Sequence, residues 1–240
     1  MPSPPLIKLI YGALLLLAID AAISLSLVSS MVSFLHHRGG AWFAVAYPPG
    51  SPFNLAGHPA NLIVNQGHTS NGASGTALVL VGFGGVLALW LERRSRTKLG
   101  KSSPAFYIWG VTTVLSCLLT LTALVYTFVV TAQTAGQAVD LAVASRNPAP
   151  AHYPDDSWTP ENWYDAVLGL PLADAADRDA IARALRLMRG WRFNLIPLFV
   201  LGLVLAALVV LEVLSGRKPR GRYGKTASGD VYTGDAKQEA

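Results

Sequence analysis

Charged residues and cysteines are scarce in this sequence of 240 residues. Charged side chains make up 14% of it, whereas soluble domains carry about 25%. The chain therefore lacks the charge that a water-exposed surface needs, and its 52% of hydrophobic residues give a mean hydropathy of +0.39. A single cysteine, Cys117, forms no intramolecular bridge, so a disulfide scaffold is excluded. A membrane protein is the class that this composition favours.

Sequence patterns of known catalytic and ligand-binding sites are missing as well. The chain has no Walker, His-Glu-x-x-His or kinase-type motif. No histidine or serine partner at a recognisable spacing accompanies the acids of the 132–192 segment, which are Asp155, Asp156, Glu161 and Asp165. No compact metal-ligand spacing joins the histidines, which are His36, His37, His58, His68 and His152. We expect no enzyme, no cofactor and no metal, with a metal- or pH-sensing histidine site as the alternative.

Four apolar runs are long enough, or nearly so, to cross a bilayer core of about 30 Å, which needs about 20 helical residues. They cover residues 9–35, 75–91, 106–131 and 193–214. Backbone groups in lipid must be satisfied within each segment, so all four are expected to be α-helices. The prediction is an all-α, membrane-embedded four-helix bundle over residues 1–215. Within these residues, the runs are connected by outer segments at 36–74 and 132–192 and by a short loop at 92–105. Residues 216–240 are predicted to form a disordered basic-to-polar tail.

Positive charges predict how the chain is threaded, because cytoplasmic loops carry an excess of lysine and arginine. Ten such residues lie in the 92–105 loop and at 217–225, and Lys8 precedes the first run, whereas the 36–74 segment holds only Arg38. Both termini are therefore predicted to be cytoplasmic, in the plasma membrane or a secretory-pathway membrane. The six arginines at 132–192 argue against this, but eight acids accompany them in a segment too long for the rule.

The first run has a second interpretation. Lys8 precedes an apolar core, and Ser24-Leu25-Ser26 has the small residues of a cleavage site, as in a signal peptide. The apolar stretch continues past Asp20 to Leu35, which is too long for a signal peptide and favours a retained span.

Small residues recur along the apolar runs, as they do where membrane helices pack closely. In the third run they follow steps of three and four, which place them on one helix face. We expect these residues to lie between helices: Ala18, Ala22, Ser26, Ser30, Gly82, Gly85, Thr113, Ser116, Thr120, Thr127, Gly202 and Ala206. A polar conduit lined by the hydroxyls is the alternative.

Asp20 is an acid inside the first apolar run. A charged side chain at the bilayer centre costs about 2.5–3.5 kcal/mol, so such groups normally face the bundle or water. Ser24 lies about 40° from Asp20 around a helix, so the two form the candidate intramembrane polar site. One interpretation is a protonated, hydrogen-bonded carboxyl that fixes helix register, and the other is a proton- or cation-responsive site.

The 132–192 segment contains two helix signals. Thr159 precedes Pro160 and caps a helix that Gly169 ends, and Asp174 caps a second helix that runs to about Met188. The second helix is amphipathic and basic, so it is predicted to lie on the membrane surface, cap the bundle or bind a partner. Its apolar and basic residues are Ile181, Leu185, Met188, Arg183 and Arg186.

Two stretches carry a resemblance. They read Trp158-Thr159-Pro160-Glu161-Asn162-Trp163-Tyr164 and Leu187-Met188-Arg189-Gly190-Trp191-Arg192-Phe193-Asn194-Leu195-Ile196-Pro197. Here the chain resembles four-span integral membrane proteins of filamentous fungi, a likeness that implies topology and membrane location but no activity. The layout is also similar to claudin-like, MARVEL-type, tetraspanin and fungal PalI-type proteins. Claudins and tetraspanins depend on cysteine pairs in an outer loop, which this chain lacks.

Two functional hypotheses remain. The first is a non-enzymatic structural, organising or accessory subunit, with a membrane protein or a second copy of the chain as partner. The second is a small transporter, channel or pH/ion sensor subunit that uses Asp20. In either case the five cations at 217–225 predict attraction to anionic lipid, and nucleic acid is not an expected partner.

Overall fold

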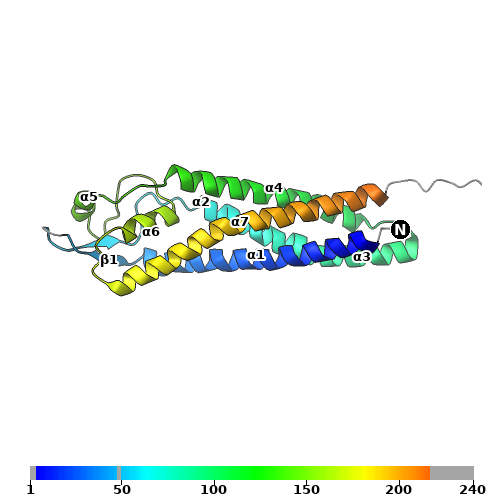
Figure 1. Ribbon diagram of the computed structural model, residues 1–240, viewed down its shortest axis with the longest axis horizontal. Helices are drawn as coiled ribbons and strands as arrows, with labels where there is room; N and C mark the ends of the chain where they lie inside the picture. The colour runs from blue at the N-terminus through cyan, green and yellow to red at the C-terminus, as the bar shows by residue number, and fades with distance from the viewer. Residues whose placement is uncertain (1–3, 48–49, 217–240) are drawn as a thin grey trace, which may run out of the picture.

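The computed structural model describes residues 4–47 and 50–216, so the predicted tail lies almost wholly outside the described residues. Figure 1 shows an elongated molecule in which four long helical rods run alongside one another, with short elements gathered at one end. α1 (Pro4–Gly39) begins and α7 (Ala175–Gly216) ends at the opposite end. The all-α fold class with its four-helix bundle is confirmed.

Between α1 and α7 the chain forms both strands and helices. In chain order these elements are β1 (Trp42–Val45), β2 (Phe53–Ala56), α2 (Asn65–Thr76), the π-helix η1 (Ala77–Phe83), α3 (Gly84–Leu99), α4 (Pro104–Gln133), α5 (Leu141–Arg146) and α6 (Pro160–Leu168).

Four helical segments are long and apolar enough to cross a membrane: Leu6–Gly39, Asn65–Leu99, Pro104–Gln133 and Ala175–Ser215. Each contains the whole of one predicted run, but each is longer than a bilayer requires. α7 has 42 residues and is about 63 Å long, roughly twice the bilayer core. Apart from Leu187, its exposed large apolar side chains lie between Phe193 and Leu214. We call the part of the bundle alongside residues 193–214 of α7 the apolar belt. Beyond it the helices continue into one end of the molecule, which we call the head (residues 27–47, 50–72 and 131–192).

The second spanning helix begins ten residues before the predicted run, because α2, η1 and α3 form one continuous rod. α2 reads Asn-Gln-Gly-His-Thr-Ser-Asn-Gly-Ala-Ser-Gly-Thr and is too polar for hydropathy to detect. Tertiary packing holds it helical, since Ser70 and Ser74 are fully buried against neighbouring helices. The rod ends at Gly100, whose φ of 64° is a left-handed conformation that glycine adopts without strain.

The prediction of a separate amphipathic helix ending near Met188 is wrong. Asp174 caps it as expected, with its Oδ1 accepting from the Ala176 N–H at 2.8 Å, but the helix then continues without interruption through the belt. Ile181 and Met188 are fully buried and Leu185 is 4% exposed. A membrane-surface position is therefore excluded for this apolar face, because it packs inside the head.

The predicted outer segment 36–74 contains a two-stranded hairpin. β1 and β2 pair antiparallel, with Phe43 opposite Leu55 and Val45 opposite Phe53. Phe43, Val45 and Leu55 point inward and are buried. The chain then passes so close to α1 that a Cβ at Gly57 would lie 2.1 Å from the Arg38 carbonyl oxygen. Glycine is therefore required where the hairpin meets the end of α1.

Two hydrophobic cores follow one another along the molecule. The bundle core is mainly aliphatic and includes Ile10, Leu17, Val81, Leu195 and Leu205. The head core is rich in aromatic residues, with Phe43, Tyr153, Trp158, Trp163 and Tyr164. Buried indoles normally find a hydrogen-bond acceptor, and the Trp163 indole N–H donates to the Gly57 carbonyl oxygen at 2.9 Å. The head is thus a packed unit joined to the bundle by continuous helices.

Candidate functional site

The predicted Asp20 site is only partly assembled. Ser24 is fully buried, but its hydroxyl oxygen accepts from the Ser74 hydroxyl at 2.8 Å across the α1–α2 interface. Asp20 lies at the edge of the buried face of α1, and its Oδ2 is buried without a hydrogen-bond partner among residues 4–47 and 50–216. The carboxyl therefore stands apart from the hydroxyl that was expected to accompany it.

The four hydroxyl residues of α4 that were predicted to lie between helices are buried, as close helix packing requires. The group consists of Thr113, Ser116, Thr120 and Thr127. Thr113 donates to the Trp109 carbonyl oxygen and Thr120 to the Ser116 carbonyl oxygen, both at 2.9 Å. Thr127 lies 3.5 Å from the Ser70 hydroxyl of α2. These hydrogen bonds are used within the bundle, which favours packing over a polar conduit.

Gly85 allows α3 and α4 to approach closely, because a Cβ there would lie 2.8 Å from Cζ2 of Trp109. Gly82 of η1 is buried as well, and it faces Ala18 of α1. The Trp109 indole N–H donates to the Val81 carbonyl oxygen at 3.0 Å. Val81 lies in η1, where the π-helical turn displaces carbonyls from their usual partners, so the indole stabilises an irregular segment. Gly202 and Ala206 of α7 are buried too.

The small-residue stripe of α1 points away from the bundle. Ala18 is half-buried and faces Gly82, but Ala22, Ser26 and Ser30 are exposed, so the packing prediction is wrong for these three. The buried face of α1 instead carries larger residues at the same helical spacing: Leu14, Leu17, Ala21, Ser24 and Val28. Ser30 satisfies its hydroxyl locally by donating to the Ser26 carbonyl oxygen at 2.8 Å.

A buried ionic cluster joins three segments at the end of the bundle where α1 begins. Arg96 of α3 pairs with Glu92 on its own helix and, at 3.0 Å, with Glu212 of α7. Both carboxylates are buried, at 3% and 2% exposure. The backbone N–H of Ser103, which caps α4, donates to Glu92 at 2.6 Å. The four-residue spacing of Glu92 and Arg96 predicts their pairing, whereas nothing in the sequence predicts Glu212 as a partner.

A second ionic cluster joins α6 to α7 in the head. Glu161 lies 3.1 Å from Arg192 and 3.6 Å from Arg189, which also donates to Asp165 at 2.9 Å. Burial raises the pKa of Glu161, and the two arginines oppose this shift without cancelling it. The Arg192 guanidinium also packs over the rings of Phe128 and Phe193, with centroid distances of 5.4 and 4.9 Å. The cluster thus ties α6, α7 and α4 together where the belt meets the head.

The two arginines predicted to face a membrane or a partner are free to do so. Arg183 and Arg186 are exposed on the first half of α7, on the side opposite the buried apolar residues. No described residue forms a salt bridge with either of them.

Two histidines from different loops lie against each other in the head. The rings of His58 and His152 stack with centroids 4.2 Å apart, and His152 Nδ1 lies 3.0 Å from the His58 carbonyl oxygen. In the described part of the chain, no three histidine, cysteine or acidic residues are grouped as a metal site requires.

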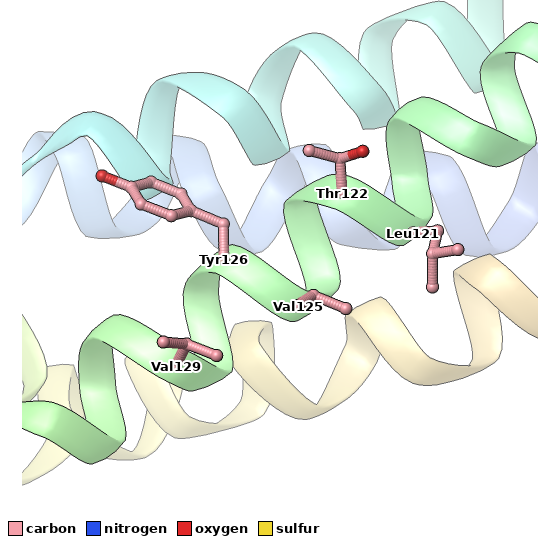
Figure 2. Close-up of a pocket in the computed structure, with 5 residues that line it drawn as sticks. All are labelled: Leu121, Thr122, Val125, Tyr126 and Val129. Carbon is pink, nitrogen blue, oxygen red and sulfur yellow. The ribbon is translucent and has the colours of Figure 1, made fainter.

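An open hollow lies on the surface of α4. Figure 2 shows the side chains that line it, which are Leu121, Thr122, Val125, Tyr126 and Val129. All five come from one helix, and Thr122 already donates to the Leu118 carbonyl oxygen at 3.0 Å. The hollow is typical of a helix surface in contact with lipid tails.

The fold defines the class of protein, a multi-pass membrane protein whose four apolar helices form a bundle. Comparison of the chain with protein-family models, curated proteins and solved structures gives no match.

Proposed function

We propose that the protein is a non-enzymatic structural, organising or accessory subunit of the plasma membrane or a secretory-pathway membrane. Its partners contact the surface of the head. The supporting observation is the continuity of α1 and α7 from the belt into the head. The two helices are also linked beyond the belt, because Arg38 pairs with Asp177 at 3.0 Å. A head built in this way holds its surface at a fixed distance from the membrane.

The exposed face of α7 in the head is the proposed partner surface. Arg183 and Arg186 lie one turn apart there and present positive charge. The partner is a membrane protein with an acidic surface, or a second copy of the chain that presents exposed acids such as Asp155 and Asp156.

Crosslinking in intact cells tests this surface. The variant Arg183→Glu/Arg186→Glu is expected to lose the crosslinked partner while reaching the membrane normally. Arg146→Glu is the matched control, because Arg146 is also exposed in the head but lies on α5. Equal crosslinking in all three proteins would remove the proposed surface.

The proposed orientation places the termini and the 92–105 loop in the cytoplasm and the head outside it. The cation count supports this orientation. In a Cys117→Ser background, Thr97→Cys and His152→Cys place single thiols at opposite ends of the molecule, both at exposed positions. A membrane-impermeant maleimide added to intact cells is expected to label residue 152 and spare residue 97. The reverse pattern contradicts the orientation.

Two further proposals concern relatives and lipid. The Trp158–Tyr164 run, which includes the buried Trp163, and the Leu187–Pro197 run support a relationship with the four-span proteins of filamentous fungi. The cations at 217–225, which lie outside the described residues, support binding of anionic lipid at about 1 kcal/mol per charge near the surface.

A transporter, channel or sensor subunit is the second candidate, because Asp20 has a buried and unpartnered carboxyl oxygen. Purified protein in liposomes, with and without Asp20→Asn, tests it by proton and cation flux. Flux that Asp20→Asn abolishes supports this candidate, and an absence of flux from the native protein supports the structural role.

A further inference from the structure

A pocket of about 280 Å³ lies in the head, between α1, the start of α2 and the first residue of α6. Its apolar walls include Met31 and Leu35 of α1 and Leu62 of the loop before α2. The pocket is slightly smaller than typical drug-sized sites, which range over about 300–1,000 Å³, so it suits a single alkyl chain. It extends over about 12 Å of α1, from Val28 to His36.

Three exposed polar residues that can donate hydrogen bonds also line the pocket: His36, His68 and Asn71. His68 and Asn71 are three residues apart on α2, so their side chains are neighbours on one helix face. No acidic residue is among the described residues that line the pocket, so no carboxylate there repels an anion. Imidazole and amide N–H groups that meet a carboxylate form charge-assisted hydrogen bonds, which are about twice as strong as neutral ones.

The height of this pair of donors above the membrane follows from the hydrogen bond between Ser24 and Ser74, which sets α1 and α2 at a common level. Ser24 directly follows Ile23, where the exposed large apolar residues of the belt end on α1. Asn71 and His68 precede Ser74 on α2, so they lie about 4.5 and 9 Å beyond this level. The polar headgroup layer is about 5–7 Å deep on each side of the core, so the two donors lie close to the headgroups.

The apolar walls lead away from the membrane. Met31 and Leu35 lie about 10 and 16 Å beyond Ser24 along α1, farther from the belt than His68. His36 lies at the distant end, about 18 Å beyond Ser24. A bound amphiphile would therefore keep its polar group at headgroup depth, between His68 and Asn71, and extend its chain into the head.

We propose that this pocket binds one single-chain amphiphile with a carboxylate head, of the fatty-acid class. The carboxylate accepts hydrogen bonds from His68 and Asn71, and the alkyl chain packs against the apolar walls. A cationic head would find no acidic partner among the described lining residues, and a neutral head would lose the charge-assisted bonds. The site does not depend on the proposed partner surface, because Arg183 and Arg186 do not line it.

Photolabelling of the purified full-length protein in detergent at neutral pH tests the proposal. The probe is decanoic acid bearing a diazirine on its chain, and the competitors are decanoate, methyl decanoate and decylamine. We expect crosslinks in residues 28–36 and 62–71, with decanoate competing about tenfold better than the ester or the amine, the size of one charge-assisted hydrogen bond. Equal competition by the ester or the amine, or labelling spread evenly over the belt, would overturn the proposal.

Variants at the mouth separate the polar contact from the apolar fit. The double variant His68→Leu/Asn71→Leu is expected to retain labelling but lose the preference for decanoate over its ester. His37→Leu is the matched control, because His37 is exposed beside the pocket but does not line it. An unchanged preference in the double variant, or the same loss in the control, refutes the polar contact.

Filling the pocket tests the apolar fit. A Cβ at Gly67 would lie 3.6 Å from Cε of Met31, an ordinary contact, so Gly67→Ala is expected to label like the native protein. Gly67→Phe fills the pocket from α2, and Val32→Trp fills it from α1, where Val32 is 44% exposed. Both are expected to lose labelling while helicity, measured by circular dichroism, is unchanged. Persistent labelling in a folded variant of this kind refutes the assignment.

Discussion

The contact between Gly85 and Trp109 gives the sharpest stability prediction. In Gly85→Ala the new Cβ would lie 2.8 Å from Cζ2 and 2.9 Å from Cε2 and Nε1 of the indole. Trp109 has little room to move, because it is 4% exposed and donates to the Val81 carbonyl oxygen. Either α3 and α4 separate or the indole gives up its hydrogen bond.

The magnitude follows from three opposing effects. Alanine for glycine in a helix interior gains about 0.5–1 kcal/mol from the unfolded chain. Overpacking costs about 1–3 kcal/mol, and losing the buried hydrogen bond adds about 1 kcal/mol. We therefore expect Gly85→Ala to lower the free energy of unfolding by about 1–3 kcal/mol.

Titration with sodium dodecyl sulfate in mixed micelles, followed by circular dichroism, measures this change. Gly84→Ala is the matched control one residue away, where the nearest atom to an added Cβ is the Val79 carbonyl oxygen at 3.8 Å. This variant is expected to equal or exceed the native stability. A Gly85→Ala protein as stable as Gly84→Ala would refute the close packing of α3 against Trp109.

Three further predictions concern the ionic clusters and a helix cap. Arg96→Met leaves Glu92 and Glu212 buried without their cation, so the same titration is expected to show a loss of about 3–5 kcal/mol. Burial raises the pKa of Glu161, so the folded protein binds this proton more tightly than the unfolded chain does. The stabilisation from this protonation is present below the unfolded pKa near 4.5 and is lost as the pH rises through the folded pKa. The Tm of the native protein should therefore fall relative to that of Glu161→Gln as the pH rises above about 4.5, and a constant difference contradicts this. Thr159→Ala removes the cap of α6 and should cost about 1 kcal/mol, seen as faster amide exchange confined to that helix.

Local rules predicted the features that depend on neighbouring residues. Thr159 caps α6 through the Asn162 N–H at 3.3 Å, Pro160 is its first residue, and the helix ends at Leu168. The predicted hydroxyls of α4 are buried because a step of three and four residues defines one face, and Thr127 on that face meets Ser70 of α2. Capping, spacing and hydropathy act over one or two helical turns, so they can be read directly from the chain.

Features that depend on distant partners were not predictable in the same way. Helical spacing identifies a face of α1 but does not say which side the bundle lies on, so Ala22, Ser26 and Ser30 were assigned inward and lie outward. The pairing of Glu212 gives no sequence signal, because its partner Arg96 lies far away in the sequence. The burial of Gln66 gives no sequence signal either, because α2 is polar and only the folded chain encloses this side chain.

The two ionic clusters together fix the depth of α7 in the membrane. Arg192 immediately precedes the apolar belt that starts at Phe193, and Glu212 lies two residues before its end at Leu214. A shift of one helical turn, about 5.4 Å, would carry one cluster into hydrocarbon, where a single charge costs about 2.5–3.5 kcal/mol. The same shift would bring apolar side chains at the other end into water. Because α7 continues into the head, this resistance to sliding also holds the head at a set height above the bilayer, which the organising role proposed above requires.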